Sequence, residues 1–218
     1  MKIISSILLL FFFNQSSYCQ SQYSLGIMAS PDFTYINGNK IAKDYTTIPG
    51  YKFGITFYKK ISKNFFITSG IWYDKKGIKQ SILINFYDST GAIIKKEKGT
   101  YYHKYKDLEM PLFINFMSGK SRLKFCISTG FSFGFAIRET VTFSSPSSTN
   151  IYNVKSNRTL PDRINFCFSM GVLYKINYKY ALFIEPNYKI DVRAIYETLL
   201  DDSHSYGLRT TLIYKFKY

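Results

Sequence analysis

The segment from Leu123 to Ile137 alternates between large apolar and small side chains, and this alternation constrains the fold more than any other feature. Its odd positions carry Leu, Phe, Ile and Thr, whereas its even positions carry Lys, Cys, Ser, Gly and Ala. Because a β-strand points successive side chains to opposite faces, the segment predicts a strand with one apolar face and one crowded face of small groups. Such a strand suits a membrane-spanning barrel, with the apolar face toward lipid.

The same alternation recurs along the chain in seven further segments, each bounded by polar or turn-forming residues. Eight such segments predict an all-β fold, an eight-stranded antiparallel up-and-down transmembrane β-barrel. The expected strands are Tyr23–Ser30, Tyr51–Tyr58, Phe65 to beyond Trp72, Tyr102–Phe116, Leu123–Arg138, Arg163–Ile176, Ala181–Val192 and Ser205–Tyr218.

The connections between these strands alternate in length, which predicts short periplasmic turns and longer extracellular loops. The Asp88–Gly91 turn has apolar residues on both sides, so the second long loop is expected to be an extruded β-hairpin. The short connections are Lys59–Asn64, Met117–Arg122 and Asn177–Lys179, and the long ones are Pro31–Gly50, Gly77–Tyr101, Thr140–Asp162 and Arg193–His204.

A soluble eight-stranded cup of lipocalin type is the competing fold, with the apolar face turned inward around a ligand. Alternation alone does not say which face lies inside. Small groups on one face, aromatic residues on the other and an amphipathic aromatic last strand favour the membrane barrel.

The first 19 residues predict a secretory signal peptide, with Lys2 followed by an apolar run from Ile3 to Phe13. Cleavage after Cys19 is expected, because Ser17 and Cys19 are small residues near the cut. A lipoprotein signal, which would acylate Cys19, is disfavoured because Tyr18 is bulky. Residues 20–218 are then one barrel domain, which predicts export to the cell outer membrane.

The charge balance is strongly basic, at +15 for the whole chain and +14 once residues 1–19, with one Lys and no acid, are removed. This balance suggests anionic surroundings, such as outer-membrane lipopolysaccharide or an acidic periplasmic or secretion-apparatus protein. Lysine-rich loops that keep the chain soluble during transit explain it equally well. No nucleic-acid motif is present, and a monomer is expected.

Asp107–Phe116 contains the pattern L-E-M-P-L, Thr129–Phe135 is a glycine-bearing strand that follows it, and the segment from Tyr206 onward forms the last expected strand. These three segments resemble strands of the PorT-like outer-membrane β-barrel family, in which the first has the pattern L-E-[IM]-P-L. The resemblance implies an eight-stranded outer-membrane barrel, and the family's namesake supports protein secretion and gliding. Pro111 within this motif predicts a bulge or a register offset, because proline cannot donate a ladder hydrogen bond.

Alternation also places acidic and basic side chains inside the barrel, where they must be paired or hydrated. We expect a salt-bridge plug, with a narrow or gated pathway for protons or small ions as the alternative, since eight strands leave little room for a pore. The candidate lumen network is Asp107, Glu109, Lys124, Lys175, Glu185, Lys189, Asp191 and Arg209. The same rule directs Arg138 and Lys215 inward.

Cys126 and Cys167 lie on the small-residue faces of two neighbouring strands. If the strands pair so that these residues lie nearly opposite, a disulfide could form in an oxidising periplasm. Two small buried thiols are the default expectation. No metal-site spacing and no phosphate-binding glycine loop occur, so no cofactor is predicted.

The histidines give weak signals for catalysis. His204 lies in Asp201–Ser205, where a Ser–His–Asp site can be imagined, but sequence adjacency is not triad geometry. We therefore expect a solvated loop histidine and no enzyme. The sequence favours a non-catalytic structural or interaction barrel, with a PorT-like secretion accessory, an outer-leaflet lipid-modifying enzyme and a lipocalin-like ligand binder as alternatives.

Overall fold

The structure, a computed structural model, describes residues 23–36, 45–87, 89–91, 93–119, 121–146, 149–154, 163–194 and 203–216. Within these ranges, no helix is both long enough and apolar enough to cross a membrane. The expected signal peptide, residues 1–19, lies outside them. The strands are β1 (Tyr23–Ile36), β2 (Tyr45–Lys60), β3 (Phe65–Tyr87), β4 (Ile93–Ser118), β5 (Leu123–Ser144), β6 (Thr149–Val154), β7 (Arg163–Lys175), β8 (Tyr180–Ala194) and β9 (Ser203–Lys215).

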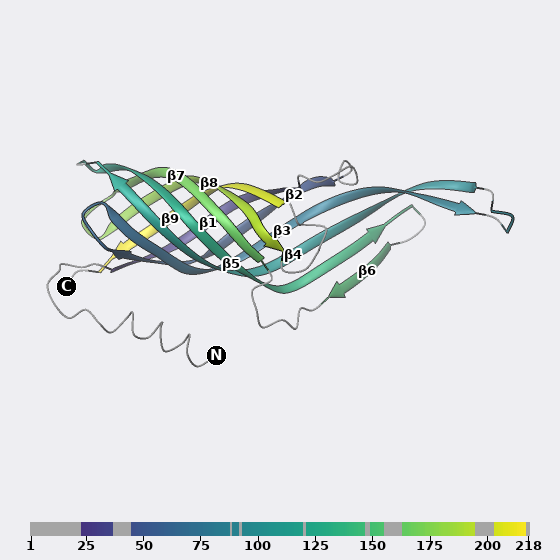
Figure 1. Cartoon of the computed structure of the whole chain (residues 1–218), viewed down its shortest axis with the longest axis horizontal. Helices are drawn as coiled ribbons and strands as arrows, with labels where there is room; N and C mark the ends of the chain where they lie inside the picture. The colour runs from purple at the N-terminus through teal and green to yellow at the C-terminus, as the bar shows by residue number, and fades with distance from the viewer. Residues whose placement is uncertain are drawn as a thin grey trace, which may run out of the picture.

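Eight of these strands form a closed antiparallel ring, in the order β4-β3-β2-β1-β9-β8-β7-β5, with a β4–β5 pairing completing the circle (Figure 1). The first and last strands are neighbours, with Ser24 opposite Lys215. The predicted eight-stranded antiparallel barrel is therefore confirmed. The additional strand β6 lies outside the ring and pairs with the far end of β5, from Glu139↔Val154 to Ser144↔Thr149.

The outer surface of the barrel is apolar and the interior is polar. An inward apolar face of the lipocalin kind is thus not found in the described strands. Exposed side chains along the outside include Ile27, Phe53, Ile55, Phe57, Ile71, Leu112, Ile114, Phe125, Ile127, Met170, Leu208 and Leu212. This surface suits contact with lipid, because apolar side chains exposed to water in such density would be costly.

Aromatic residues border the apolar band at both ends. Phe65 packs on Phe116 at 5.2 Å between ring centroids near the turns, and Phe33 stacks on Tyr206 at 5.5 Å near the other end. Tyr23 and Phe33 are ten residues apart on β1, which at about 3.3 Å per residue and a tilt of about 40° corresponds to roughly 25 Å of height. That height matches the apolar band of a membrane barrel.

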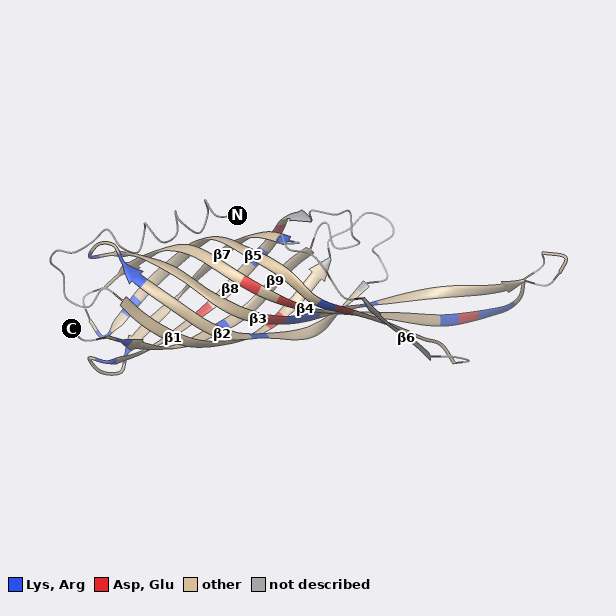
Figure 2. Ribbon diagram, turned by 90° about the horizontal axis from the view of Figure 1, so that it is seen from below, with Lys and Arg blue, Asp and Glu red and all other residues tan. Residues whose placement is uncertain are grey.

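The two ends of the barrel differ in form. At the first, here called the turn end, the connections 61–64, 119–122 and 176–179 are short. The first residues of β1 and the last residues of β9 also lie at this end. At the other, the loop end, β3 and β4 continue as a long paired ribbon to Tyr87↔Ile93, and β5 and β6 form a shorter one (Figures 1 and 2). The predicted extruded hairpin is present.

Several strands are longer than the sequence suggested. β1 runs through Pro31 to Ile36, and β2 begins at Tyr45 instead of Tyr51. The expected loop Thr140–Asp162 contains the end of β5 and all of β6. The sequence analysis interpreted proline and polar residues as strand ends. The strands continue past these residues because their backbones pair with neighbouring strands.

The predicted bulge or register offset at Pro111 is wrong. On the β3 side the pairs Ser69↔Leu112 and Trp72↔Glu109 keep one register across a local gap in the ladder. The β1–β9 ladder has the same kind of gap at Pro31, between Ala29↔Thr210 and Asp32↔Gly207. The strands thus accommodate these prolines by losing ladder contacts on one side, with no inserted residue.

The bulge in β5 occurs instead beyond Ala136. Asp107 pairs with Ala136 but Lys106 pairs with Arg138, so Ile137 is the extra residue. One inserted residue reverses the faces of everything that follows. Arg138 is consequently exposed, which corrects its predicted position in the lumen, and Glu139 takes the inward side.

Candidate functional site: the barrel interior and its turn-end mouth

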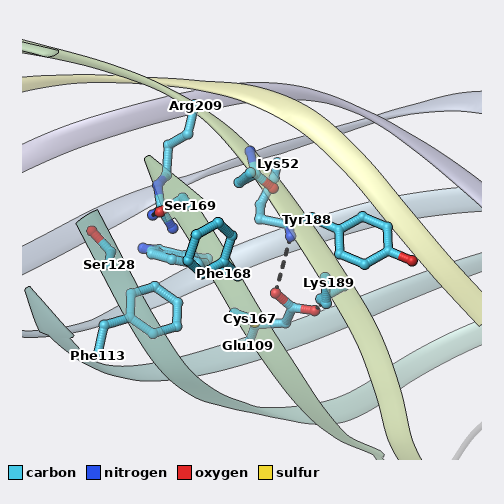
Figure 3. Close-up of a pocket in the computed structure, with 12 residues that line it drawn as sticks. Lys52, Glu109, Phe113, Ser128, Cys167, Phe168, Ser169, Tyr188, Lys189 and Arg209 are labelled. Carbon is cyan, nitrogen blue, oxygen red and sulfur yellow. Dashed lines mark hydrogen bonds and ion pairs between the residues drawn. The ribbon is translucent and has the colours of Figure 1, made fainter. Parts of the chain in front are cut away.

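A central ion-pair cluster fills the middle of the lumen. Lys52 of β2 contacts Asp32 at 2.9 Å and Glu109 at 3.2 Å, and Lys189 of β8 contacts Glu109 at 2.6 Å and Asp74 at 3.3 Å. All five side chains are at least nine-tenths buried. Glu109 therefore lies between two lysines from nearly opposite parts of the ring (Figure 3).

A second group continues this cluster toward the loop end. Lys76 contacts Asp107 at 2.9 Å and Asp74 at 3.6 Å, and Arg163 contacts Asp107 at 3.5 Å while lying over the ring of Tyr105. Asp191 is buried and close enough to Arg163 to interact electrostatically. Lys76 and Asp74 join the two groups into one network.

A third group lies toward the turn end. Arg209 donates to Glu185 at 2.6 Å and to the Ser169 hydroxyl at 3.2 Å, and Ser169 in turn donates to Glu185 at 2.6 Å. The guanidinium also lies about 5 Å from the ring centroids of Trp72 and Phe113. Contacts with aromatic faces and hydrogen bonds to a carboxylate together stabilise the charge of a buried guanidinium.

Gly171 makes room for this pair. A side chain at Gly171 would overlap the Ile184 carbonyl and the Cβ of Glu185, so glycine is required for the close approach of the two strands. Below the pair, an apolar layer closes the lumen with Tyr58, Phe66, Cys126, Leu173, Ala181, Phe183 and Ile213.

The central lumen holds almost no free space. The pocket among Lys52, Trp72, Glu109 and Arg209 has a volume of about 10 Å³, which is the space of about one water molecule. Buried charges in such a space are stable only when they are paired, and here cations and carboxylates alternate. The described residues at this level can therefore act as a rigid plug.

The structure brings together five of the predicted lumen residues with paired partners, and places the others apart. Asp107, Glu109, Glu185, Lys189 and Arg209 form the ion pairs described above, and Asp191 lies beside Arg163. Lys124 and Lys175 contribute no ion pair to this network and instead line a pocket at the turn end, together with Lys215.

Sequence reasoning missed five members of the network. Lys52 alternates with Tyr51 and Phe53, so the same inward–outward rule could have found it. Asp74 and Lys76 follow Trp72 on the same face, beyond the point to which that strand was followed. Asp32 was assigned to a loop because of Pro31, and Arg163 was taken as a strand end.

The turn-end pocket has a volume of about 260 Å³, far more than the central pocket. Its rim carries basic residues and its floor is apolar. Figure 2 shows Lys and Arg positions, in blue, at the end of the barrel opposite the long ribbon. The pocket is lined by Ser24, Tyr58, Lys60, Ser62, Lys63, Asn64, Phe65, Phe66, Met117, Lys124, Leu173, Lys175, Ile213 and Lys215.

Cys126 and Cys167 are free, as the default expectation had it, and they do not lie opposite each other, as a disulfide would have required. Cys126 pairs with Gly171 and Cys167 pairs with Gly130, so the two are offset by four residues along the strands. That offset is about 13 Å at 3.3 Å per residue, too far for a disulfide. Cys126 packs in the apolar layer, whereas Cys167 lines the central pocket beside Glu109 and Lys189.

His204 is not in a loop but in β9, where its ring stacks on Tyr188 and shares a 2.8 Å hydrogen bond with the Tyr188 hydroxyl. The neighbouring Ser205 faces the interior and bonds to Thr34 at 3.2 Å. The serine and the histidine thus point to opposite faces of the sheet. Asp201 and Asp202 lie outside the described residues.

His103 lies at the loop-end mouth, beyond the bulge in β5 and outside the membrane-spanning part of the strands. Its Nδ1 is 3.7 Å from a carboxylate oxygen of Glu139. This contact is the main reason why the pKa of Glu139 is lowered from its usual value. Within the described residues, no group of three or more His, Cys, Asp or Glu side chains has the arrangement of a metal site.

Comparison with known proteins adds an architecture but no function. No protein-family model matches the sequence, and no curated protein matches it. The solved structures it is similar to include the outer membrane protein OprG of Pseudomonas aeruginosa, with 10% identity, a TM-score of 0.47 and coverage of 91% of this chain and 98% of that one. Neisserial surface protein A has 12% identity, a TM-score of 0.46 and coverage of 91% and 100%.

The outer membrane protease OmpT of Escherichia coli is also similar, with 8% identity, a TM-score of 0.44 and coverage of 93% and 99%. These proteins are outer-membrane barrels, which agrees with the apolar outer band of this chain. At such identities and TM-scores, none of their activities is carried over. The assignment of eight strands rests on the strand pairing of the chain itself.

Proposed function

We propose that this chain is a non-catalytic outer-membrane barrel that holds a β-sheet outside the membrane, where the sheet binds a partner with an anionic surface. The turn end then faces the periplasm and the loop end faces outward, as in barrels with short periplasmic turns. The plugged lumen supports a role other than transport, because its charges are paired and its free space is about one water molecule.

The observation that carries the proposal is the length of the β3–β4 ladder. It runs from Phe65↔Phe116 to Tyr87↔Ile93, within strands of 23 and 26 residues. A membrane-spanning strand needs only about 9–11 residues. More than half of each strand therefore extends beyond the bilayer, and a ribbon this long has no use in closing the barrel.

The chemistry of the ribbon supports an anionic partner. From Gly77 to Lys106 the sequence has six lysines against two acids, Asp88 and Glu97. Apolar side chains near the tip are exposed, with Leu83 57%, Tyr87 58% and Ile94 66% accessible. Lysines beside exposed apolar groups suit the phosphates and acyl boundary of lipopolysaccharide, or an acidic face of a protein.

One alternative has specific support. The PorT-like motif around Glu109 and Pro111 supports an accessory role in a secretion or motility apparatus. An enzyme at the outer leaflet would need a catalytic constellation, and the described residues around His204 do not converge.

The test removes the tip of the ribbon while keeping its register. Residues 83–98 are deleted, and Ile82 is joined to its partner Gly99 through an Asn-Gly turn. The matched control replaces Lys95, Lys96 and Lys98 by Gln and keeps the ribbon. Both variants complement a strain that lacks the gene, and assembly is monitored by the mobility of unboiled protein in SDS gels.

We expect the deletion variant to assemble at wild-type levels and yet to show the same envelope sensitivity as the null strain, with partial loss for the charge variant. Full complementation by the deletion variant would place the function elsewhere. A secretion defect would favour the accessory role. A change in the lipid A mass spectrum that depends on His204 would favour an enzyme.

A further inference from the structure

The turn-end mouth is surrounded by five lysines from separate parts of the ring. They come from the end of β2, the turn before β3, the start of β5 and the ends of β7 and β9. The ammonium group of Lys124 is close enough to those of Lys175 and Lys60 for the three to repel one another. The lysine ring comprises Lys60, Lys63, Lys124, Lys175 and Lys215.

Within the described residues, no acidic side chain is placed to neutralise the lysine ring. The sequence has no Asp or Glu in residues 45–73, 110–138, 163–184 or 203–218, which include the strand segments at the turn end. The acidic side chain nearest along β8 is Glu185, and it is already bonded to Arg209 and Ser169. The described part of the chain thus leaves the neutralisation of the ring to an anion from another molecule.

The floor beneath the lysine ring is apolar. Tyr58, Leu173 and Ile213 are buried there and form part of the layer that closes the lumen. An engineered apolar cavity of about 150 Å³ accepts benzene, so a space of about 260 Å³ accepts an aromatic or branched side chain with its flanking backbone. The pocket therefore combines a site for an apolar group with surrounding sites for carboxylates.

We propose that the turn-end pocket binds an acidic peptide segment of a periplasmic protein, with an apolar side chain on the floor and flanking carboxylates on the lysine ring. A peptide is favoured over a bilayer lipid because the floor residues face the lumen, whereas lipid contacts the outer face of the barrel. The periplasmic position rests on the orientation given above, but the binding chemistry does not depend on any partner at the loop end.

The test uses isothermal titration calorimetry with the full mature chain refolded in a neutral detergent. The probe is the peptide Asp-Glu-Phe-Glu-Asp, blocked at both ends, with two comparison peptides in which Phe is replaced by Ser or the acids by Lys. We expect the Phe peptide to bind at least tenfold more tightly than the Ser peptide, and the basic peptide not to bind. Added salt should weaken the binding.

Two variants separate charge from shape. Lys124→Gln with Lys175→Gln should lower the affinity for the Phe peptide at least tenfold. Lys179→Gln, at the same end but outside the pocket lining, should change this affinity less than twofold. Ser24→Phe places a ring in the pocket and should weaken the Phe peptide while leaving the Ser peptide unchanged. The mobility of unboiled protein verifies folding of each variant.

Equal affinities for the Phe and Ser peptides would mean that binding is to a diffuse positive surface, and would overturn the proposal. A loss of affinity in Lys179→Gln as large as in the Lys124→Gln and Lys175→Gln variant would have the same meaning. Displacement of the peptide by dihexanoyl phosphatidylglycerol at one tenth of the peptide concentration would assign the pocket to lipid. That result would also overturn the proposal.

Discussion

The barrel interior contains lysines in two opposite settings. In the central lumen, Lys52 and Lys189 are buried and each contacts at least two carboxylates. At the turn end, Lys124 and Lys175 have only other lysines and neutral groups around the same pocket. The difference shows that charge inside this barrel depends on access to water: where water is excluded every cation is paired, and where solvent enters the chain tolerates repulsion.

The largest effect is expected from breaking the central cluster at Glu109, which contacts both lysines. Glu109→Gln leaves two buried cations short of a carboxylate, which should lower the free energy of unfolding by about 3 kcal/mol or more. Urea unfolding in lipid vesicles measures it. Met110→Leu, a lipid-facing neighbour, serves as the control. A loss below about 1 kcal/mol for Glu109→Gln would contradict the claim that the central lysines depend on their carboxylate partners.

The Arg209–Glu185 pair tests whether the network stabilises the barrel or merely avoids a penalty. Glu185→Leu alone leaves the guanidinium unpaired and should cost about 3 kcal/mol, because a lone buried charge is poorly solvated. Adding Arg209→Met should recover most of that loss, since both charges are then gone. The same urea titration compares both variants, and a double variant as unstable as the single one would show that the pair contributes net stability.

The smallest effect, and one of opposite sign, is expected at the turn end. Lys124→Gln with Lys175→Gln removes repulsion between nearby cations and should raise the free energy of unfolding by about 0.5 kcal/mol. The gain should vanish at high salt, because screening removes the repulsion. Lys189→Gln provides the contrast, since it should destabilise the barrel at every salt concentration. Changes of the same sign in the free energy of unfolding for the turn-end variant and for Lys189→Gln would contradict the distinction between turn-end and central lysines.

Side-chain alternation was sufficient to predict the eight strands, their order and the inward direction of Glu109, Glu185 and Arg209. It succeeds because a strand has a fixed period of two and one face must meet lipid. The same rule, applied to Tyr51–Phe53, would also have placed Lys52 inside. The central cluster was therefore largely accessible from the sequence.

The remaining errors come from register and from insertions, which alternation does not encode. The two cysteines share a face, but only the pairing of β5 with β7 reveals their four-residue offset. One extra residue at Ile137 turns Arg138 outward. The contrast between Lys124 and Lys189 also depends on height along the barrel, because both have the same inward parity and only their distance from the acids differs.

The pairing of β1 with β9 makes closure of the barrel and charge neutralisation inside it depend on the same strand. β9 supplies both the partner edge for β1, at Ser24↔Lys215, and the guanidinium that neutralises Glu185. A chain that lacks β9 would expose an open edge and an unpaired carboxylate at the same time. The loss of one thirteen-residue strand thus produces both defects together.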